Sequence, residues 1–447
     1  MDRKIIKAYN KTRPAAKRQR ICHAPFRSMR FTITGNVLAC CYNRYQVLGS
    51  YPSDKLNDIW FGKNIIQLRS RLENNDLNLG CQRCLHDIES RNFYSTGARF
   101  YDYLPEKKAG YPVMLDFEID NTCNLECVMC SGENSSLIRK NREKKPPYPI
   151  PYDHDFISQL KEFFRFIQEA RFVGGEPFPQ EMNYRIWEQL MEINPGAKIS
   201  VLTNGTILND RIRELLVKGN FHISVSIDSL QKETYEKIRV NADFEKVMEN
   251  MAFFMEDAKQ NERPFCINVC PMPYNWQDIP GLFNFANQKN IHVFLHTVVF
   301  PPHASLRYQP PEKLQEIISF MEKQKLKGFS KVQRANKKTF SSFISQLKGW
   351  HNYSNENRDS AGLLTEDFHT LKEMLFKKIS EYIVSTGDHE KDLLFYTGRL
   401  EEAFTATGSE ETCQKAIVSI LQLEPRDIVA ELEISNTERL VERIIAA

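Results

Sequence analysis

The stretch Leu115-Asp-Phe-Glu-Ile-Asp-Asn-Thr-Cys123-Asn-Leu-Glu-Cys127-Val-Met-Cys130 decides how this 447-residue chain folds. Apolar residues come to alternate with acidic ones over 113–119, which is typical of a β-strand. A polar loop follows and carries three cysteines with the spacing C-x3-C-x2-C. A cubane 4Fe–4S cluster takes one further ligand per iron, so three thiolates would leave one iron open. Two alternatives stay open: a zinc site that lacks one ligand, or three unrelated core cysteines.

In its strand–loop setting, this cysteine triplet resembles that of the radical SAM superfamily. The resemblance implies a partial (β/α)6 barrel in which Cys123, Cys127 and Cys130 hold a 4Fe–4S cluster after the first strand. It also implies that S-adenosylmethionine (SAM) chelates the open iron and is cleaved by one electron from the cluster. The resulting 5′-deoxyadenosyl radical would abstract hydrogen from an unactivated C–H bond. Met129 departs from the family pattern, which usually has an aromatic residue there.

A second motif, Phe172-Val-Gly-Gly-Glu-Pro177, resembles the second-strand motif of the same family. Gly174 and Gly175 would let the backbone approach a ligand closely. The carboxylate of Glu176 could meet a cation such as the ammonium group of SAM. The motif follows a short apolar run about forty residues after the cysteine loop, as the resemblance requires.

Strand-like and helical segments alternate through the centre of the chain. Strands are predicted at 113–119, 171–173, 199–202, 221–227, 265–269 and 291–299. Helices are predicted between them, at 157–170, 181–193, 209–218, 243–259 and 277–288. This order predicts an α/β fold with a parallel sheet, and the motifs fall at the C-terminal ends of strands. By resemblance Asn204, Ser226 and Asp228 are candidates to contact SAM, although such residues also serve as turn or helix caps.

A second set of cysteines lies near the start of the chain, at Cys22, Cys40, Cys81 and Cys84. Four thiolates are a full ligand set for one auxiliary cluster, and equally for a structural zinc ion. With Gly35 before Cys40 and the closing Cys-x2-Cys, the pattern resembles the SPASM/twitch auxiliary-cluster domain, in its one-cluster twitch form. That domain normally follows the barrel, so the resemblance implies a permuted order here.

Two further cysteines are candidates for a functional role. Cys270 ends the fifth predicted strand, where a thiol could return hydrogen to a substrate radical as in some radical SAM epimerases. Packing in the core is the alternative, since free cysteine behaves as a small hydrophobe. Cys41 is surplus to the four-cysteine set and reads as a core thiol, an alternative ligand or a hydrogen donor.

The composition excludes some classes of protein. Hydrophobic residues make up 41% of the chain, but no apolar run reaches eighteen residues, and no secretory signal core is seen. Eleven cysteines in a non-secreted chain favour metal or redox work in a reducing cytoplasm over disulfides. Ten of the first thirty residues are Lys or Arg, which reads mainly as a solvated arm. Neither a nucleic-acid nor a membrane partner is predicted.

We expect three domains: an auxiliary-cluster domain (1–105), a radical SAM barrel (106–309) and a helical extension (310–447). In the extension, helices are predicted at 312–325, 333–349, 366–385, 412–423 and 436–446, with a loop at 351–362. The predicted function is radical SAM chemistry on a peptide or a small molecule. A donor such as flavodoxin or ferredoxin would supply electrons, and the auxiliary cluster would relay them. The alternatives are a non-catalytic iron–sulfur carrier or assembly factor, and a zinc-stabilised binding module.

Overall fold

The chain forms two compact units. The computed structural model describes residues 1–89, 91, 93, 96–104, 110–299, 301–356, 366–383, 389–421, 423, 425–435 and 437–446. The first unit comprises 1–30, 36–113 and 356–447, and the second comprises 31–35 and 114–355. Residues 356–447 thus belong to the same compact unit as the cysteine-rich N-terminal part. From the sequence, we expected them in a separate helical extension. The division into three domains stays a prediction.

The second unit is built on six parallel strands. They are β4 (Met114–Phe117), β5 (Glu169–Phe172), β6 (Lys198–Thr203), β7 (Phe221–Ser226), β8 (Cys266–Val269) and β9 (His292–Leu295). Each strand pairs with the next one along the chain, and all five pairings are parallel. The predicted α/β class with a parallel sheet is confirmed. Because parallel strands end at the same edge, the loops after them are brought together.

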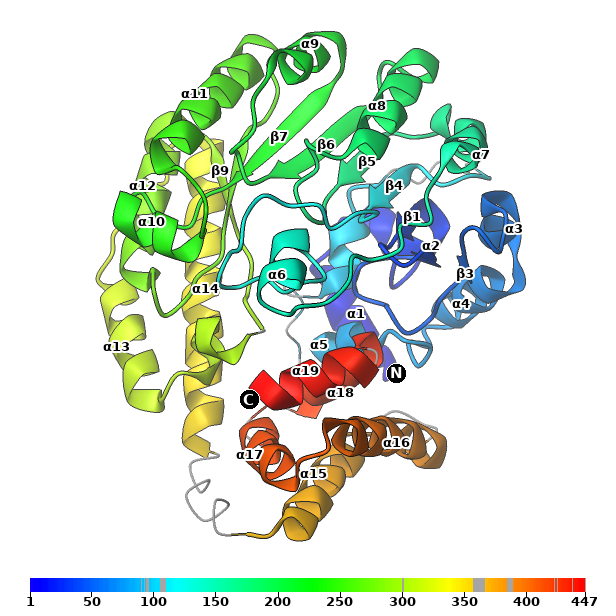
Figure 1. Ribbon diagram of the computed structural model, residues 1–447, viewed down its shortest axis with the longest axis vertical. Helices are drawn as coiled ribbons and strands as arrows, with labels where there is room; N and C mark the ends of the chain where they lie inside the picture. Colours follow the sequence, from blue (N-terminus) through cyan, green and yellow to red (C-terminus); the bar gives the residue numbers. More distant parts are fainter. Residues whose placement is uncertain are drawn as a thin grey trace. The chain divides into compact units, whose positions relative to one another are not determined.

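Helices connect these strands. They are α7 (His154–Phe164), α8 (Glu181–Ile193), α9 (Asp210–Lys218), α10 (Lys232–Ile238), α11 (Phe244–Gln260) and α12 (Ile279–Lys289). Figure 1 shows α8, α9 and α11 along the outer side of the sheet. Three of the six begin at a side chain that accepts a hydrogen bond from the first turn: Asp153, Asn209 and Asp243. The helix predicted over 157–170 ends earlier, because residues 169–172 pair in the sheet. Helix α10 was not predicted.

The sheet is packed on large aromatic side chains. The rings of Phe117 and Phe172, on neighbouring strands, stack with centroids 4.8 Å apart. Trp187 of α8 packs edge-on against Phe172 at 5.3 Å, and all three residues are fully buried. Burial of such a side chain contributes roughly 1.5–3 kcal/mol. These contacts fix the strand ends that carry the cysteine loop and the glycine motif.

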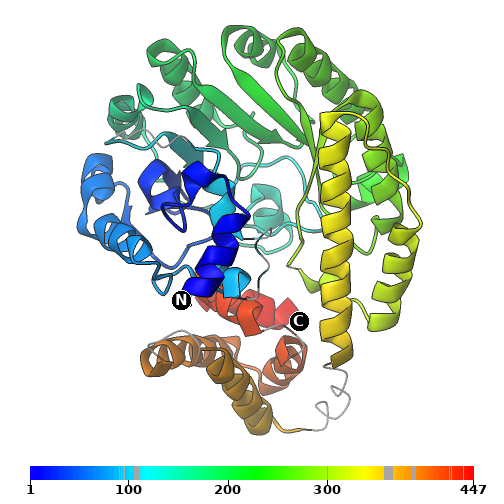
Figure 2. The same ribbon diagram turned by 180° about the vertical axis from the view of Figure 1, so that it is seen from behind.

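The last strand of this sheet is covered by a long helix. Helices α13 (Pro311–Glu322) and α14 (Lys331–Glu356) follow β9, and α14 is the long yellow helix of Figure 2. The buried amide of Asn336 on α14 accepts a hydrogen bond from the Val293 N–H and donates one to the Ile291 carbonyl. These bonds satisfy backbone groups that an edge strand would leave open. Helix α14 also continues through residues 351–356, where a loop was predicted; 357–362 lie outside the described residues.

The N-terminal part of the first unit is small and mixed. Its helices are α1 (Arg3–Lys11), α2 (Ala24–Arg27), α3 (Leu56–Phe61), α4 (Lys63–Glu73) and α5 (Gln82–Glu89). Its strands are β1 (Ser28–Phe31), which ends at the unit boundary, β2 (Asn36–Leu38) and β3 (Gly49–Ser50). Strands β2 and β3 form an antiparallel pair. Trp60, Leu68 and Leu72 are buried and anchor α3 and α4.

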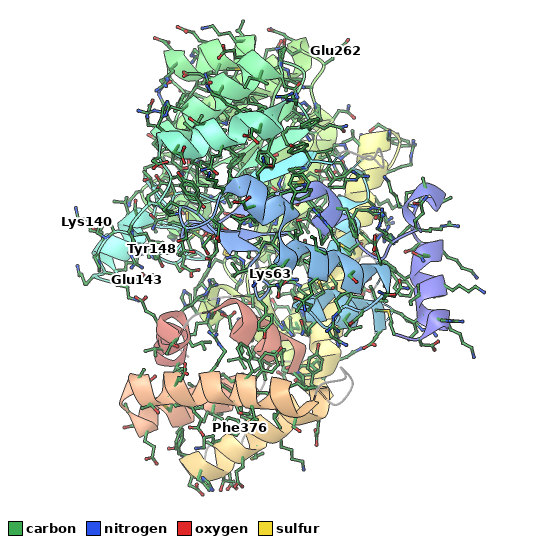
Figure 3. The ribbon with its side chains drawn as sticks, turned by 90° about the vertical axis from the view of Figure 1, so that its right-hand side faces the viewer. Lys63, Lys140, Glu143, Tyr148, Glu262 and Phe376 are labelled. Carbon is green, nitrogen blue, oxygen red and sulfur yellow. The ribbon has the colours of Figure 1, made fainter. Side chains whose placement is uncertain are left out.

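Five C-terminal helices complete the first unit: α15 (Phe368–Ile383), α16 (His389–Thr407), α17 (Glu410–Leu421), α18 (Pro425–Ile434) and α19 (Thr437–Ala446). Their apolar faces form one core, against which Phe376, labelled in Figure 3, is partly buried. Helix α18 packs on α5, and Phe395 meets Tyr45 edge-on at 5.2 Å. Among the residues that the structure describes, no helix is both long and apolar enough to cross a membrane.

Candidate functional site

The loop that carries Cys123, Cys127 and Cys130 leaves the end of β4 and runs to α6 (Ser136–Asn141). The Ser135 side chain accepts a hydrogen bond from the first turn of α6 and donates one to the Leu125 carbonyl at 2.7 Å. The Glu143 carboxylate, labelled in Figure 3, accepts one from the Gly132 N–H at 2.5 Å. The loop is therefore braced at both its middle and its end.

The same loop is also clamped to the end of α10. The Glu126 N–H donates to the Val240 carbonyl at 3.0 Å, and the Val128 N–H donates to the Ile238 carbonyl at 2.9 Å. These two hydrogen bonds flank Cys127 and hold Arg239 next to the cysteines. No sequence pattern had marked Arg239 as a site residue.

The three cysteines differ in exposure: Cys127 is buried, whereas Cys123 and Cys130 are half-buried. Burial raises the pKa of Cys123 to about 11. The Cys130 thiol donates a hydrogen bond to Cys127, which lowers the pKa of Cys127 and raises that of Cys130. Arg239 favours the thiolate form of all three cysteines, because its charge lowers each of their pKa values. Three thiols beside a fixed cation suit a metal group that needs thiolate ligands.

The Gly-Gly-Glu turn after β5 packs directly against this loop. Gly174 and Gly175 have φ of +84° and +55°, which favour glycine. A Cβ on Gly175 would lie 2.5 Å from the Thr122 carbonyl oxygen, so a side chain there would collide with the cysteine loop. The Glu176 N–H donates to that same oxygen at 2.8 Å. The structure therefore brings the two sequence motifs together.

The carboxylate of Glu176 is buried and held by the protein itself. It accepts hydrogen bonds from the Thr203 hydroxyl at 2.7 Å and the Asn204 N–H at 2.6 Å. Burial raises its pKa to about 7, against the lowering effect of these bonds. The side chain thus ties the end of β5 to the end of β6. A direct role toward a ligand cation stays a prediction.

Asn204 reaches the cysteine loop from β6. Its amide donates a hydrogen bond to the Asn124 side chain at 2.9 Å, and the same nitrogen lies 4.0 Å from the Cys123 sulfur. Its side-chain oxygen accepts from Thr206. The structure therefore places Asn204 beside the first cysteine, and its predicted contact with SAM remains untested.

Asp228 and Arg239 form a buried ion pair next to the cysteines. The Arg239 Nε lies 2.8 Å from the Asp228 Oδ2, although the two groups are not aligned as a hydrogen bond. Burial alone would lower the pKa of Arg239, but Asp228 and Cys127 outweigh burial and raise it. The Asp228 Oδ1 accepts from the Cys270 N–H at 2.7 Å. Asp228, predicted to meet SAM, thus has two protein partners.

Cys270 and Ser226 lie at the ends of neighbouring strands. Ser226 pairs in register with Asn268 and is half-buried. Burial raises the pKa of the Cys270 thiol, and the adjacent Asp228 raises it further. A neutral thiol keeps its S–H bond, which a hydrogen donor requires. That role for Cys270 and the ligand role of Ser226 stay predictions.

In the first unit, the four remaining predicted ligands line one common cavity. Cys22 precedes α2, Cys40 follows β2, Cys81 precedes α5, and Cys84 lies on α5. Burial raises the pKa of Cys22, Cys40 and Cys84 to about 12, and neighbouring thiols add to the increase. Four such thiols in one cavity suit a metal group, because metal binding replaces the thiol protons. Cys41 contacts the Tyr101 hydroxyl instead, at 3.9 Å.

The spacing of the thiols bears on which metal group fits. Four thiolates on one zinc ion would stand about 3.8 Å apart, given Zn–S bonds of about 2.3 Å in a tetrahedron. Among the described residues, no three cysteine sulfurs lie within 4.8 Å of one another. The four sulfurs therefore do not stand at the spacing of a closed zinc shell.

Two family models match this chain. Residues 117–286 match the radical SAM superfamily, and residues 22–85 match an iron–sulfur cluster-binding domain known as SPASM. The chain therefore carries a radical SAM domain and a SPASM domain, as predicted. These domains imply a 4Fe–4S cluster, SAM and an auxiliary iron–sulfur cluster as cofactors. In this chain the SPASM match lies N-terminal to the radical SAM match.

Similar proteins were found among curated sequences. A probable GTP 3′,8-cyclase of Methanocaldococcus jannaschii is 27% identical over 188 residues, which are 42% of this chain and 59% of that relative. The GTP 3′,8-cyclase of Clostridium botulinum is 26% identical over 40% of this chain and 54% of its own length. The chain thus spans little more than half the length of the curated relatives it matches.

Similar solved structures were also found. Streptococcus suis SuiB bound to precursor peptide SuiA has a TM-score of 0.36 and 15% identity, over 47% of this chain and 46% of SuiB. Native anSMEcpe with bound AdoMet has a TM-score of 0.35 and 20% identity, over 46% of this chain and 57% of that one. At these scores the similarity carries no argument about substrate.

Proposed function

We propose that this protein is an enzyme that cleaves SAM reductively and uses the 5′-deoxyadenosyl group to remove hydrogen from a substrate C–H bond. The 4Fe–4S cluster supplies the electron for that cleavage when it is bound. Cys123, Cys127 and Cys130 are the proposed ligands of this cluster. The observation that carries the proposal is the packing of the cysteine loop against the Gly-Gly-Glu turn, with Arg239 beside the thiols.

The surrounding residues have the proposed task of holding SAM and excluding water. The backbone at Gly174 and Gly175 offers a close approach, and Glu176, Asn204 and Ser226 lie on adjacent strand ends. Where these polar groups are shielded from water, their electrostatic interactions with a ligand are stronger than in bulk solvent.

The auxiliary cluster is proposed to sit between Cys22, Cys40, Cys81 and Cys84. Four protein thiolates leave no iron free for a substrate, so this cluster would relay electrons rather than bind substrate. A low-potential carrier of the flavodoxin or ferredoxin type is the proposed electron donor.

The substrate is proposed to be a peptide or a small molecule. The curated relatives are named for cyclisation of GTP, but they match only about two fifths of this chain. That match does not carry a GTP substrate over to this protein. A short open reading frame beside the gene would favour a peptide, and a sugar or antibiotic gene cluster would favour a small molecule.

The decisive experiment is SAM turnover by anaerobically reconstituted protein with a strong reductant. We expect wild type to form 5′-deoxyadenosine and Cys123→Ala to form none. Cys266→Ala is the matched control, because Cys266 is a cysteine of β8 outside both predicted ligand sets. Equal product from wild type and Cys123→Ala would refute the assigned site. Brown protein without SAM cleavage would indicate an electron carrier, and colourless zinc-loaded protein would indicate a binding module.

A further inference from the structure

One buried asparagine contacts two of the four cysteines in the SPASM domain. The backbone N–H of Asn43 donates a hydrogen bond to the Cys40 sulfur at 3.3 Å. Its side-chain amide donates to the Cys81 sulfur, also at 3.3 Å. Asn43 is only 2% exposed, so water does not replace these donors. A residue outside the predicted ligand set therefore reaches sulfurs that are 41 positions apart in the chain.

The hydrogen bonds of this amide are fully used. The Nδ2 group donates its second hydrogen to the Leu79 carbonyl at 2.9 Å. The Oδ1 atom accepts from the Gln46 N–H at 3.0 Å. These two bonds fix the plane of the amide, so its remaining N–H points at Cys81.

The chain makes room for this amide with a glycine. Gly80, directly before Cys81, has φ of +71°. A Cβ at this position would lie 2.2 Å from the Asn43 Oδ1 and 3.0 Å from its Nδ2. The turn that presents Cys81 therefore closes around the Asn43 side chain in a way that only glycine permits.

We propose that Asn43 is a positioning residue that sets the reduction potential of the auxiliary cluster. The inference rests on the proposed cluster at Cys22, Cys40, Cys81 and Cys84. Hydrogen bonds to ligand sulfurs are one of the levers that tune iron–sulfur potentials. Reduction adds one electron and hence one negative charge to the cluster. N–H dipoles aimed at its sulfurs stabilise that charge, so Asn43 raises the potential.

The test uses the full chain with Cys123, Cys127 and Cys130 replaced by Ala, so that only the auxiliary cluster gives a signal. In this background Asn43→Ala removes the side-chain donor and keeps the backbone N–H. We expect the equilibrium constant for reduction of the cluster to fall about tenfold. For one electron, this corresponds to a reduction potential about 59 mV more negative. Asn43→Asp should lower the potential further, because it also adds a negative charge. The readout is a redox titration followed by EPR.

Gln46→Ala is the matched control. This substitution changes a neighbouring side chain but keeps the Gln46 backbone N–H, which donates a hydrogen bond to the Asn43 Oδ1. The reduction potential should therefore stay at the wild-type value. An Asn43→Ala protein with a full cluster and an unchanged potential would overturn the proposal and reduce Asn43 to a structural role.

A second measurement does not depend on variants of Asn43. Protein grown with asparagine that is ¹⁵N-labelled only at the side-chain amide is examined by pulsed EPR in the same three-alanine background. We expect a ¹⁵N coupling to the reduced cluster, and its absence would also overturn the proposal. If the three-alanine protein bound no iron, the proposed auxiliary cluster itself would be refuted. SAM cleavage by the wild type tests the radical SAM site separately.

Discussion

Replacing Asp228 by Asn tests the buried ion pair beside the cysteine loop. Asp228 is fully buried and Arg239 is 7% exposed, with their charged atoms 2.8 Å apart. Asparagine keeps an oxygen for the Cys270 N–H, so the substitution mainly removes the charge. The guanidinium would then stay buried without its carboxylate partner. We expect a loss of about 3–5 kcal/mol in the free energy of unfolding.

The assay is urea-induced unfolding of anaerobically reconstituted protein, followed by tryptophan fluorescence. Trp187 and Trp276 are buried in the same unit as the ion pair and report on its unfolding. For a unit of this size, about 1 kcal/mol corresponds to roughly 2–4 °C, so the melting temperature should fall by about 6–20 °C.

Two controls separate charge burial from general damage. Glu181→Gln breaks the pair with Arg211, which is also 2.8 Å long but exposed on both sides. Its stability should change little, because solvent screens that pair. The double variant Asp228→Asn/Arg239→Met removes both charges and should recover most of the loss. The reasoning would be refuted if Asp228→Asn matched Glu181→Gln, or if the double variant were no better than Asp228→Asn.

Two further predictions concern the turn after β5. The buried Glu176 has a pKa of about 7, raised above its usual 4.5, so the folded state holds its proton more tightly than the unfolded state. Stability should therefore fall by about 3 kcal/mol as pH rises through this window, and Glu176→Gln should flatten the fall in urea titrations at pH 4.5, 6 and 7.5. Gly175→Ala should force the cysteine loop away from the turn and lower the iron bound at the SAM cluster, measured in protein whose Cys22 is also Ala. Gly281→Ala is the control, because a new Cβ at this position of α12 meets open space. This variant should bind as much iron as its parent, and its free energy of unfolding should rise by up to about 1 kcal/mol.

The sequence predicts the barrel strands well because each is a local pattern. Apolar runs that end in Gly, Asn or Asp mark four of the six parallel strands, and the family models confirm both cysteine-rich domains. Helix boundaries were less certain. The segment 157–170 has apolar residues that suit a helix, yet its last two residues form strand β5. Pairing with β4 decides their conformation, and no local pattern reports that pairing.

The partners of charged and polar site residues could not be predicted. Arg239 follows a short amphipathic helix, where an arginine normally faces solvent, and only the fold turns it toward Asp228. Asn43 stands three residues after Cys40 in a polar loop. The one local signal for it is Gly80 before Cys81, which in sequence reads as an ordinary turn glycine. Both roles depend on contacts between segments far apart in the chain.

The SPASM domain shows the same limit on a larger scale. Cys84 lies on α5, and α5 packs on α18 from the far end of the chain. His86, two residues after Cys84, lies 5.6 Å from the Tyr382 ring of α15. The apolar faces of the last five helices thus bury one another and also support the helix that carries a predicted ligand. This support could not be predicted, because the amphipathic pattern of a helix shows that it is buried but not against which segment.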